Sequence, residues 1–229
     1  MFFSESAVWG HRGWPSRYPD NSEAGIRAAA GVAAGVEIDI RATADGQLAL
    51  SHDPELAGRV VCETSWADLA ALRVGGHPPA RLDDVVDVGV PLDLEVKNDP
   101  DEPDFDPTHR VGRQVADRAR PGDILTSFWW PTVDAVRESH PDVSTGLLLW
   151  GPMDPRDAVR RAVDRGHRVV APERSQVTEE LVALVRSEGL QIVTWTVDDV
   201  AEAARLAALG VDAIISNRPG ELIESQGQT

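Results

Sequence analysis

Residues 36–53 read "VEIDIRATADGQLALSHD", and the first five positions alternate between apolar and acidic side chains. Val36, Ile38 and Ile40 occupy one face of the predicted strand, and Glu37 and Asp39 occupy the other. An edge strand with its acids in water would show the same alternation. A buried strand instead places two carboxylates about 7 Å apart in the protein interior, where they need a partner of opposite charge.

A second stretch, "PLDLEVKND" at residues 91–99, repeats this pattern. Its aliphatic residues alternate with Asp93, Glu95 and Lys97, so a second strand that looks like core carries charges on one face. The edge-strand interpretation weakens, because it has to hold separately for both strands. The repeated pattern favours two strands whose charged faces meet inside the fold.

The whole chain alternates short apolar runs with longer helix-like segments. The predicted strands are residues 7–10, 36–41, 91–96, 123–127, 143–149, 168–171, 191–196 and 212–215. The predicted helices are residues 22–34, 66–72 with 82–87, 108–119, 131–139, 155–165, 178–188 and 199–209. This alternation predicts an α/β fold, a (β/α)8 TIM barrel formed by residues 1–229 as a single domain, with a short hairpin after the second strand. A doubly wound open sheet is the alternative, and both folds place chemistry at the C-terminal ends of the strands.

Four residues mark expected helix ends. Ser22 precedes an alanine-rich run, Pro131 fits a first helical turn, and Asp198 precedes the helix at 199–209. Gly210 is the expected C-terminal cap of that last helix.

The 229 residues include 22 basic and 38 acidic side chains, which give a formal net charge of −16. This charge disfavours binding to nucleic acid through a general basic surface. The single cysteine, Cys62, excludes an internal disulfide framework. The first ten residues lack the features of a signal peptide, and no run approaches the roughly 20 apolar residues of a membrane-spanning helix. We therefore expect a cytoplasmic protein without a membrane span.

Glu37, Asp39 and Glu95 together predict an oxygen-rich metal site. Inside a barrel, two like charges on one strand raise each other's pKa or require a cation. No cysteine accompanies these acids, which disfavours structural zinc, and hard carboxylate oxygens suit Ca²⁺ or Mg²⁺. Lys97, two residues beyond Glu95 on the same face, is placed to meet an anion bound to that cation.

Two histidines flank this predicted site. His11 and Arg12 directly follow the first strand, although a single histidine at a strand end is more often structural than catalytic. The segment 36–53 reads as a hairpin that turns at Asp45-Gly46 and returns His52 over the end of the second strand. Two histidines beside a metal-bound phosphodiester suit general acid–base cleavage, in which one takes a proton and the other protonates the leaving alkoxide. The set predicts a phosphate ester as substrate.

Several motifs, in the right order, resemble the glycerophosphodiester phosphodiesterase family: "HRG", "PDNS", "VEIDIRATADGQLALSHD", "RLDDVVDV" followed by "LDLEVK", "ILTSF", "TWTVDD" and "GVDAIISNRP". The resemblance covers nearly the whole chain and is densest at residues 9–53. It implies a (β/α)8 barrel that uses a divalent cation, Ca²⁺ or Mg²⁺, to hydrolyse glycerophosphodiesters to glycerol 3-phosphate and an alcohol. It also implies that the substrate's own 2-hydroxyl attacks phosphorus and gives a cyclic phosphate, which water then opens.

By matching position, the resemblance assigns a role to seven residues. It implies His11 and His52 as the acid–base pair, Glu37, Asp39 and Glu95 as metal ligands, and Arg12 and Lys97 as phosphate contacts. Which histidine is the acid and which is the base stays open. Two positions depart from the family pattern: Asp20 stands where the family usually has Glu, and Asn217 stands where the last strand often ends near an Asp.

Tryptophan is unusually frequent, with seven residues against four phenylalanines and one tyrosine. Trp129, Trp130, Trp150 and Trp195 fall near the expected mouth of the barrel. For Trp195, capping the barrel core explains its position as well as binding does, whereas the pair Trp129–Trp130 favours binding. Trp130 and Trp195 are thus the candidate contacts for a leaving alcohol that is choline-like or lipidic.

Two other functions would use the same residues. The first is a lysophospholipase D-like phosphodiesterase, which would act on lysophospholipids with the same histidines and acids. The second is a non-catalytic barrel that binds a phosphorylated ligand, and the joint presence of both histidines, three acids, Arg12 and Lys97 disfavours it. In each case the predicted partner is a small molecule and not a nucleic acid.

Overall fold

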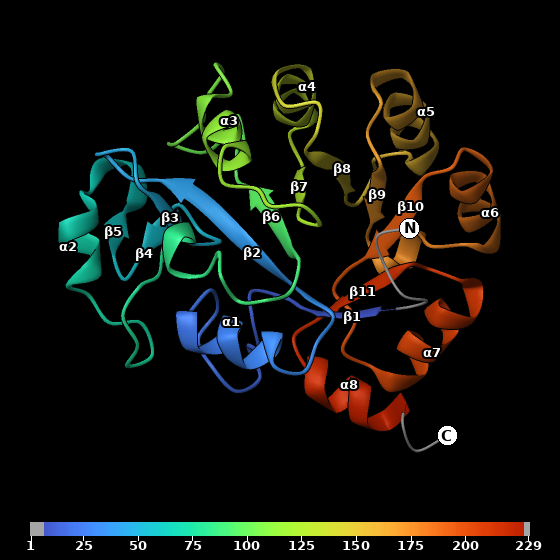
Figure 1. The fold of residues 1–229 in the computed structure, drawn as a ribbon, viewed down its shortest axis with the longest axis horizontal. Helices are drawn as coiled ribbons and strands as arrows, with labels where there is room; N and C mark the ends of the chain where they lie inside the picture. Colours follow the sequence, from blue (N-terminus) through green and yellow to red (C-terminus); the bar gives the residue numbers. More distant parts are fainter. Residues whose placement is uncertain (1–6, 227–229) are drawn as a thin grey trace.

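The computed structural model describes residues 7–226, and eight parallel strands form a closed barrel at its centre (Figure 1). The strands are β1 (Ala7–Gly10), β2 (Gly35–Ala42), β6 (Leu92–Val96), β7 (Ile124–Ser127), β8 (Ser144–Leu149), β9 (Val169–Pro172), β10 (Gln191–Thr194) and β11 (Ala213–Ser216). Around the ring the order is β1, β11, β10, β9, β8, β7, β6 and β2, and β1 pairs with β2 to close it. The predicted (β/α)8 barrel is confirmed, and the open-sheet alternative is wrong.

Helices between the strands form the outer layer of the barrel (Figure 1). They are α1 (Glu23–Ala30), α3 (Arg110–Ala116), α4 (Trp130–Ser139), α5 (Pro155–Arg165), α6 (Glu179–Ser187), α7 (Val200–Leu209) and α8 (Pro219–Gln226). α8 lies beyond the last predicted helix, and its first two residues, Pro219 and Gly220, have low helix propensity. Proline is tolerated in a first turn, and Gly220 lets the helix approach Trp14, whose ring would lie 2.3 Å from an added Cβ. Within residues 7–226, no helix has the length and apolar composition that crossing a membrane requires.

The expected helix ends are confirmed except at the start of α7. Ser22 is the N-cap of α1, Pro131 lies in the first turn of α4, and Gly210 ends α7 in the left-handed conformation with φ of 89°. The prediction that Asp198 starts α7 is wrong, because the N-cap is Asp199. Asp198 instead accepts hydrogen bonds from residues at the end of β11.

Small elements replace the helix that would normally lie between β2 and β6, and they extend to the left of the ring in Figure 1. The chain turns at Gly46 and returns as β3 (Leu48–Leu50), antiparallel to β2, so the predicted hairpin is confirmed. It continues through β4 (Glu55–Leu56), β5 (Arg59–Val60), a 3₁₀ turn (Val61–Glu63) and the short helix α2 (Trp66–Ala70). The helix predicted over 82–87 is only a 3₁₀ turn at Leu82–Asp84.

The two faces of β2 and β6 belong to different parts of the core. Their aliphatic residues, such as Ile38 and Leu94, pack in one cluster with helix residues such as Ile26 and Val115. A separate apolar cluster that includes Trp9 fills part of the barrel interior. Since side chains alternate along a strand, the charged residues of β2 and β6 point into the barrel.

Candidate active site

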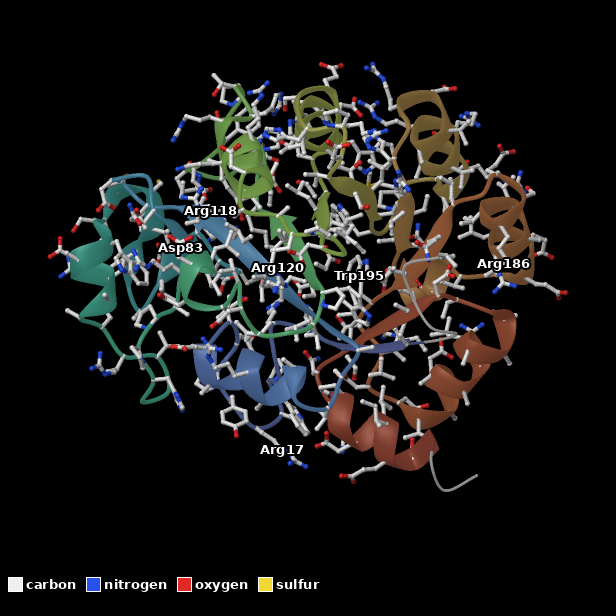
Figure 2. The ribbon with its side chains drawn as sticks, viewed as in Figure 1. Arg17, Asp83, Arg118, Arg120, Arg186 and Trp195 are labelled. Carbon is white, nitrogen blue, oxygen red and sulfur yellow. The ribbon has the colours of Figure 1, made fainter. Side chains whose placement is uncertain are left out.

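A cavity of about 660 Å³ opens at the C-terminal ends of the barrel strands. Of the predicted site residues, it is lined by His11, Arg12, Glu37, His52, Glu95, Lys97 and Trp195. Figure 2 shows Trp195 within the ring of strands. The structure thus brings to one place residues that the sequence separates by more than half of the chain.

Glu37, Asp39 and Glu95 converge on one point beside this cavity. The parallel pairing of β2 and β6 sets Asp39 next to Glu95 and Glu37 next to Asp93. The three predicted ligands are buried, and one carboxylate oxygen from each lies within 4.8 Å of the other two. Such a group of hard oxygen donors has the composition and spacing of a divalent-cation site.

Two cationic side chains and an amide keep Asp39 ionised. Lys97 Nζ lies 3.0 Å from Asp39 Oδ1 and also bonds Glu95, while Arg12 Nε lies 3.1 Å from Asp39 Oδ2. Asn21 Nδ2 donates a hydrogen bond to the same Oδ2 at 2.8 Å. Burial by itself would raise the pKa of Asp39, but Lys97, Arg12 and Asn21 outweigh it and lower the pKa to about 2. Asn21, which has no predicted role, is therefore part of the site.

Glu37 lacks the close Lys and Arg partners that offset the negative charge of Asp39. Its Oε2 accepts a hydrogen bond from Arg12 N at 2.8 Å, whereas Oε1 is buried with no hydrogen-bond partner among the described residues. Burial, followed by the charges of Asp39 and Glu95, raises the pKa of Glu37 well above its usual range. A divalent cation held by Glu37, Asp39 and Glu95 would supply both the charge and the missing partner of Oε1. The residues present therefore fit such an ion.

Asp93, which has no predicted role, is a further buried carboxylate that lines the cavity. It lies on the same face of β6 as Glu95 and accepts a hydrogen bond from Thr126 Oγ1 at 2.6 Å. Burial raises the pKa of Asp93 to about 7. The period-two pattern of β6 already marks this residue, so the signal for it was present in the sequence.

In the metal-free protein, the free energy of unfolding is expected to fall as pH rises from about 4 to about 7. The pKa of Asp93 is 3.8 in an ordinary environment and about 7 in the folded protein, so the folded state holds more protons across this interval. The protonated Asp93 carboxyl contributes its full stabilisation below the pKa that it has in the unfolded chain. This stabilisation is lost as pH rises through the pKa that Asp93 has in the folded protein. The raised pKa of Glu37 acts in the same direction.

Asp93→Asn is expected to flatten this pH dependence, because asparagine keeps an oxygen for Thr126 Oγ1 and cannot titrate. Urea unfolding in EDTA at several pH values between 4.5 and 7.5 measures the slope for both proteins. An unchanged slope in the variant would contradict the raised pKa of Asp93.

His11 lies directly after β1, and both of its ring nitrogens have defined neighbours. Nδ1 is 2.7 Å from Asn217 Oδ1, and Nε2 is 3.9 Å from Glu37 Oε2. The backbone N–H donates to Ser216 O at 2.8 Å, which ties the end of β1 to the end of β11. Burial, and then the neighbouring Arg12, lowers the pKa of His11. The ring is therefore neutral at neutral pH and has a nitrogen able to accept a proton.

His52 follows the β2–β3 hairpin and is held mainly through its backbone. Its carbonyl oxygen accepts hydrogen bonds from Arg41 Nε at 3.0 Å and Nη2 at 2.7 Å. Arg41 is only 1% exposed and also pairs with Asp104 and Glu102. The alternation along β2 places Arg41 on the inward face with Asp39, but no sequence signal links it to acids about 60 residues further on.

Aromatic side chains line another part of the cavity: Phe128, Trp129, Trp150 and Trp195. The structure does not bring Trp130 to this lining. Its Nε1 donates to Leu148 O at 2.9 Å, and it packs against the core between the strands and helices. Because α4 begins at Trp130, adjacent side chains point in different directions, and Trp129 is the one that reaches the cavity.

Comparisons with known proteins agree on one family. A model of the glycerophosphoryl diester phosphodiesterase family matches residues 11–221. A glycerophosphodiester phosphodiesterase from Caldanaerobacter subterraneus subsp. tengcongensis is 25% identical over 246 residues, which cover 96% of this chain and 97% of that protein. A shorter region is 35% identical over 88 residues to glycerophosphodiester phosphodiesterase GDPD4 of Arabidopsis thaliana, covering 38% of this chain and 26% of that protein.

A solved structure shares the fold over almost its full length. It is an Oleispira antarctica phosphodiesterase in complex with the product sn-glycerol-3-phosphate, with a TM-score of 0.84 and 19% sequence identity. The match covers 100% of this chain and 98% of that one.

Proposed function

The chain belongs to the glycerophosphoryl diester phosphodiesterase family, and we propose that it hydrolyses glycerophosphodiesters to glycerol 3-phosphate and an alcohol with a bound Ca²⁺ or Mg²⁺. The observation that carries the proposal is the convergence of Glu37, Asp39 and Glu95 beside His11 and His52. The sn-glycerol-3-phosphate bound to the Oleispira antarctica protein supports the same product here.

The first step of the proposed reaction takes place within the substrate. The oxygen of the glycerol 2-hydroxyl bonds to phosphorus, and the bond from phosphorus to the alcohol oxygen breaks, which leaves a cyclic phosphate. His11 takes the 2-hydroxyl proton, because its lowered pKa keeps the ring neutral, and His52 donates a proton to the leaving alkoxide. Since the nucleophile and phosphorus belong to one molecule, the step avoids a bimolecular entropy cost.

Water opens the cyclic phosphate in the second step: the water oxygen bonds to phosphorus, and the bond from phosphorus to the 2-oxygen of glycerol breaks. His52, now neutral, takes a proton from the attacking water, and His11 returns its proton to the 2-oxygen of glycerol. The products are glycerol 3-phosphate and the free alcohol, and both histidines regain their starting protonation states.

Arg12 and Lys97 are the side chains that meet the phosphate. Both line the cavity, and both are tied to Asp39, so their positions are fixed before substrate arrives. Fixed positive groups stabilise the charge that develops on the phosphate oxygens without reorganising. A divalent cation held by Glu37, Asp39 and Glu95 would supply further positive charge to stabilise the phosphate.

The alcohol part of the substrate is proposed to contact Trp129, Trp150 and Trp195. Asp99 and Asp101 also line the cavity, so aromatic faces and acids occur together there. This combination favours a quaternary ammonium such as choline, while the aromatic lining by itself would also accept an apolar chain. Hydrolysis of lysophospholipids is therefore the second candidate function.

Glycerol 3-phosphate release from glycerophosphocholine tests the proposal, with Ca²⁺ or Mg²⁺ added to metal-free protein and with EDTA as the control. We expect release with at least one metal and none in EDTA. Release that is equal in EDTA would overturn metal dependence. No release, together with choline release from lysophosphatidylcholine, would favour the second candidate, and binding of glycerol 3-phosphate without turnover would favour a non-catalytic barrel.

A further inference from the structure

Two residues outside the predicted site form a hydrogen-bonded chain that ends on His11. We propose that Asp198 and Asn217 are positioning residues, which fix the ring of His11 so that its Nε2 faces the substrate with a free lone pair. The catalytic part of this inference rests on the proposed role of His11 as base. The geometric part concerns the ring alone and is measured without substrate.

Asp198 fixes the side-chain amide of Asn217. Asp198 Oδ2 accepts a hydrogen bond from Asn217 Nδ2 at 2.8 Å, and Asp198 Oδ1 accepts one from Asn217 N at 2.8 Å. Ser216 Oγ adds a third bond to Oδ1 at 3.0 Å. An ionised carboxylate only accepts hydrogen bonds, so the NH₂ group of Asn217 must face Asp198. The amide oxygen of Asn217 therefore faces the other way.

That oxygen determines which nitrogen of His11 carries the proton. Asn217 Oδ1 lies 2.7 Å from His11 Nδ1, and an amide oxygen only accepts, so Nδ1 must be the donor. In the neutral ring the proton then sits on Nδ1, and Nε2 keeps its lone pair. Nε2 is the nitrogen that lies 3.9 Å from Glu37 Oε2, on the side of the carboxylate cluster.

Backbone hydrogen bonds connect the strand ends that carry His11, Asp198 and Asn217. His11 N donates to Ser216 O at 2.8 Å, and Val197 N donates to Ile215 O at 3.0 Å, so the residues that follow β1 and β10 are both bonded to the end of β11. Asp198 and Asn217 thus contact His11 from backbone that is itself hydrogen-bonded to the barrel strands, which favours a positioning role over an incidental contact.

Three variants test the proposal, with Asp199→Asn as the matched control. Asp198→Asn removes the charge that orients the amide, and Asn217→Leu removes the acceptor for His11 Nδ1. The double variant Asp198→Asn with Asn217→Asp restores one carboxylate and one amide in reversed order. Asp199 is the N-cap of α7, and asparagine caps equally well, so the control changes the neighbouring residue without changing the chain of bonds.

We expect Asp198→Asn and Asn217→Leu to lower kcat at least about 10-fold, with little change in KM. Losing the partner that orients a histidine costs about 10- to 100-fold at metal-bound histidines and up to about 10⁴-fold in a serine-protease triad. The double variant is expected to recover at least part of this loss, and Asp199→Asn to match the wild type. Rescue by the reversed pair separates positioning from a general loss of structure. Wild-type kcat in both single variants would overturn the catalytic part of the proposal.

The ¹⁵N NMR spectrum of the imidazole groups gives a readout that needs no substrate. The wild type is expected to show His11 protonated on Nδ1, assigned by comparison with His11→Ala, and Asn217→Leu is expected to show a mixture of tautomers. An Nε2–H tautomer in the wild type would overturn the geometric part. No turnover by a wild type that has the Nδ1–H tautomer would instead overturn the proposed function.

Discussion

Replacing His11 with alanine is expected to lower kcat for glycerophosphocholine by about 100- to 10,000-fold, the range that a positioned general base contributes. In the proposed reaction, alanine leaves no group to accept the 2-hydroxyl proton, while Arg12 and Lys97, the proposed phosphate contacts, still line the cavity. KM is therefore expected to change much less than kcat. His52→Ala is expected to lower kcat by a similar factor, because the leaving alkoxide loses its proton donor.

Initial rates of glycerol 3-phosphate release over a range of substrate concentrations separate kcat from KM. His140→Ala is the matched control, since His140 follows the end of α4, bonds Asp117 and does not line the cavity. If kcat falls less than tenfold in both the His11 and the His52 variants, the acid–base assignment is wrong.

Arg41→Met is expected to lower the free energy of unfolding by about 3 to 5 kcal/mol, the usual result of removing one partner of a buried ion pair. The change leaves the largely buried carboxylate of Asp104 without Arg41 Nη1, which donates to its Oδ1 at 2.8 Å and to its Oδ2 at 2.7 Å. It also frees the carbonyl of His52 from two hydrogen bonds. We therefore expect kcat to fall as well in the fraction that stays folded.

Urea unfolding of wild type and variant measures the loss of stability. Arg27→Met is the matched control, because Arg27 pairs with Glu23 and Asp87 on the surface, where such pairs contribute about 1 kcal/mol or less. A loss in Arg41→Met no larger than in Arg27→Met would show that the buried pair does not stabilise the fold.

The barrel and its acidic face were predictable because both depend on short periodic patterns. Alternation along 36–41 and 91–96 sets which residues face inward, and the structure keeps that assignment for Glu37, Asp39 and Glu95. A parallel barrel then brings the ends of all strands to one side, which explains why His11 and Lys97 share a cavity despite their separation in the sequence.

The remaining features depend on partners that are distant in the sequence or on a boundary shifted by one residue. The alternation along β2 correctly places Arg41 on the inward face. Its partner Asp104, however, lies in a loop whose path no local sequence pattern predicts. A helix begins at Trp130 rather than after it, so Trp129 and not Trp130 reaches the cavity. Asp198 and Asp199 are chemically identical at sequence level, and only the fold distinguishes the cap of α7 from the partner of Asn217.

β1 is the first barrel strand to leave the ribosome, and β11, one of its two neighbours in the ring, is the last. The strands that carry Glu37, Asp39 and Glu95 emerge early, so the acidic cluster can form while the chain is still being made. His11 gains its contacts with Ser216 and Asn217 only after β11 is synthesised and docks. An unfinished chain therefore lacks an oriented His11, and the proposed hydrolysis would begin only once translation has delivered the last strand.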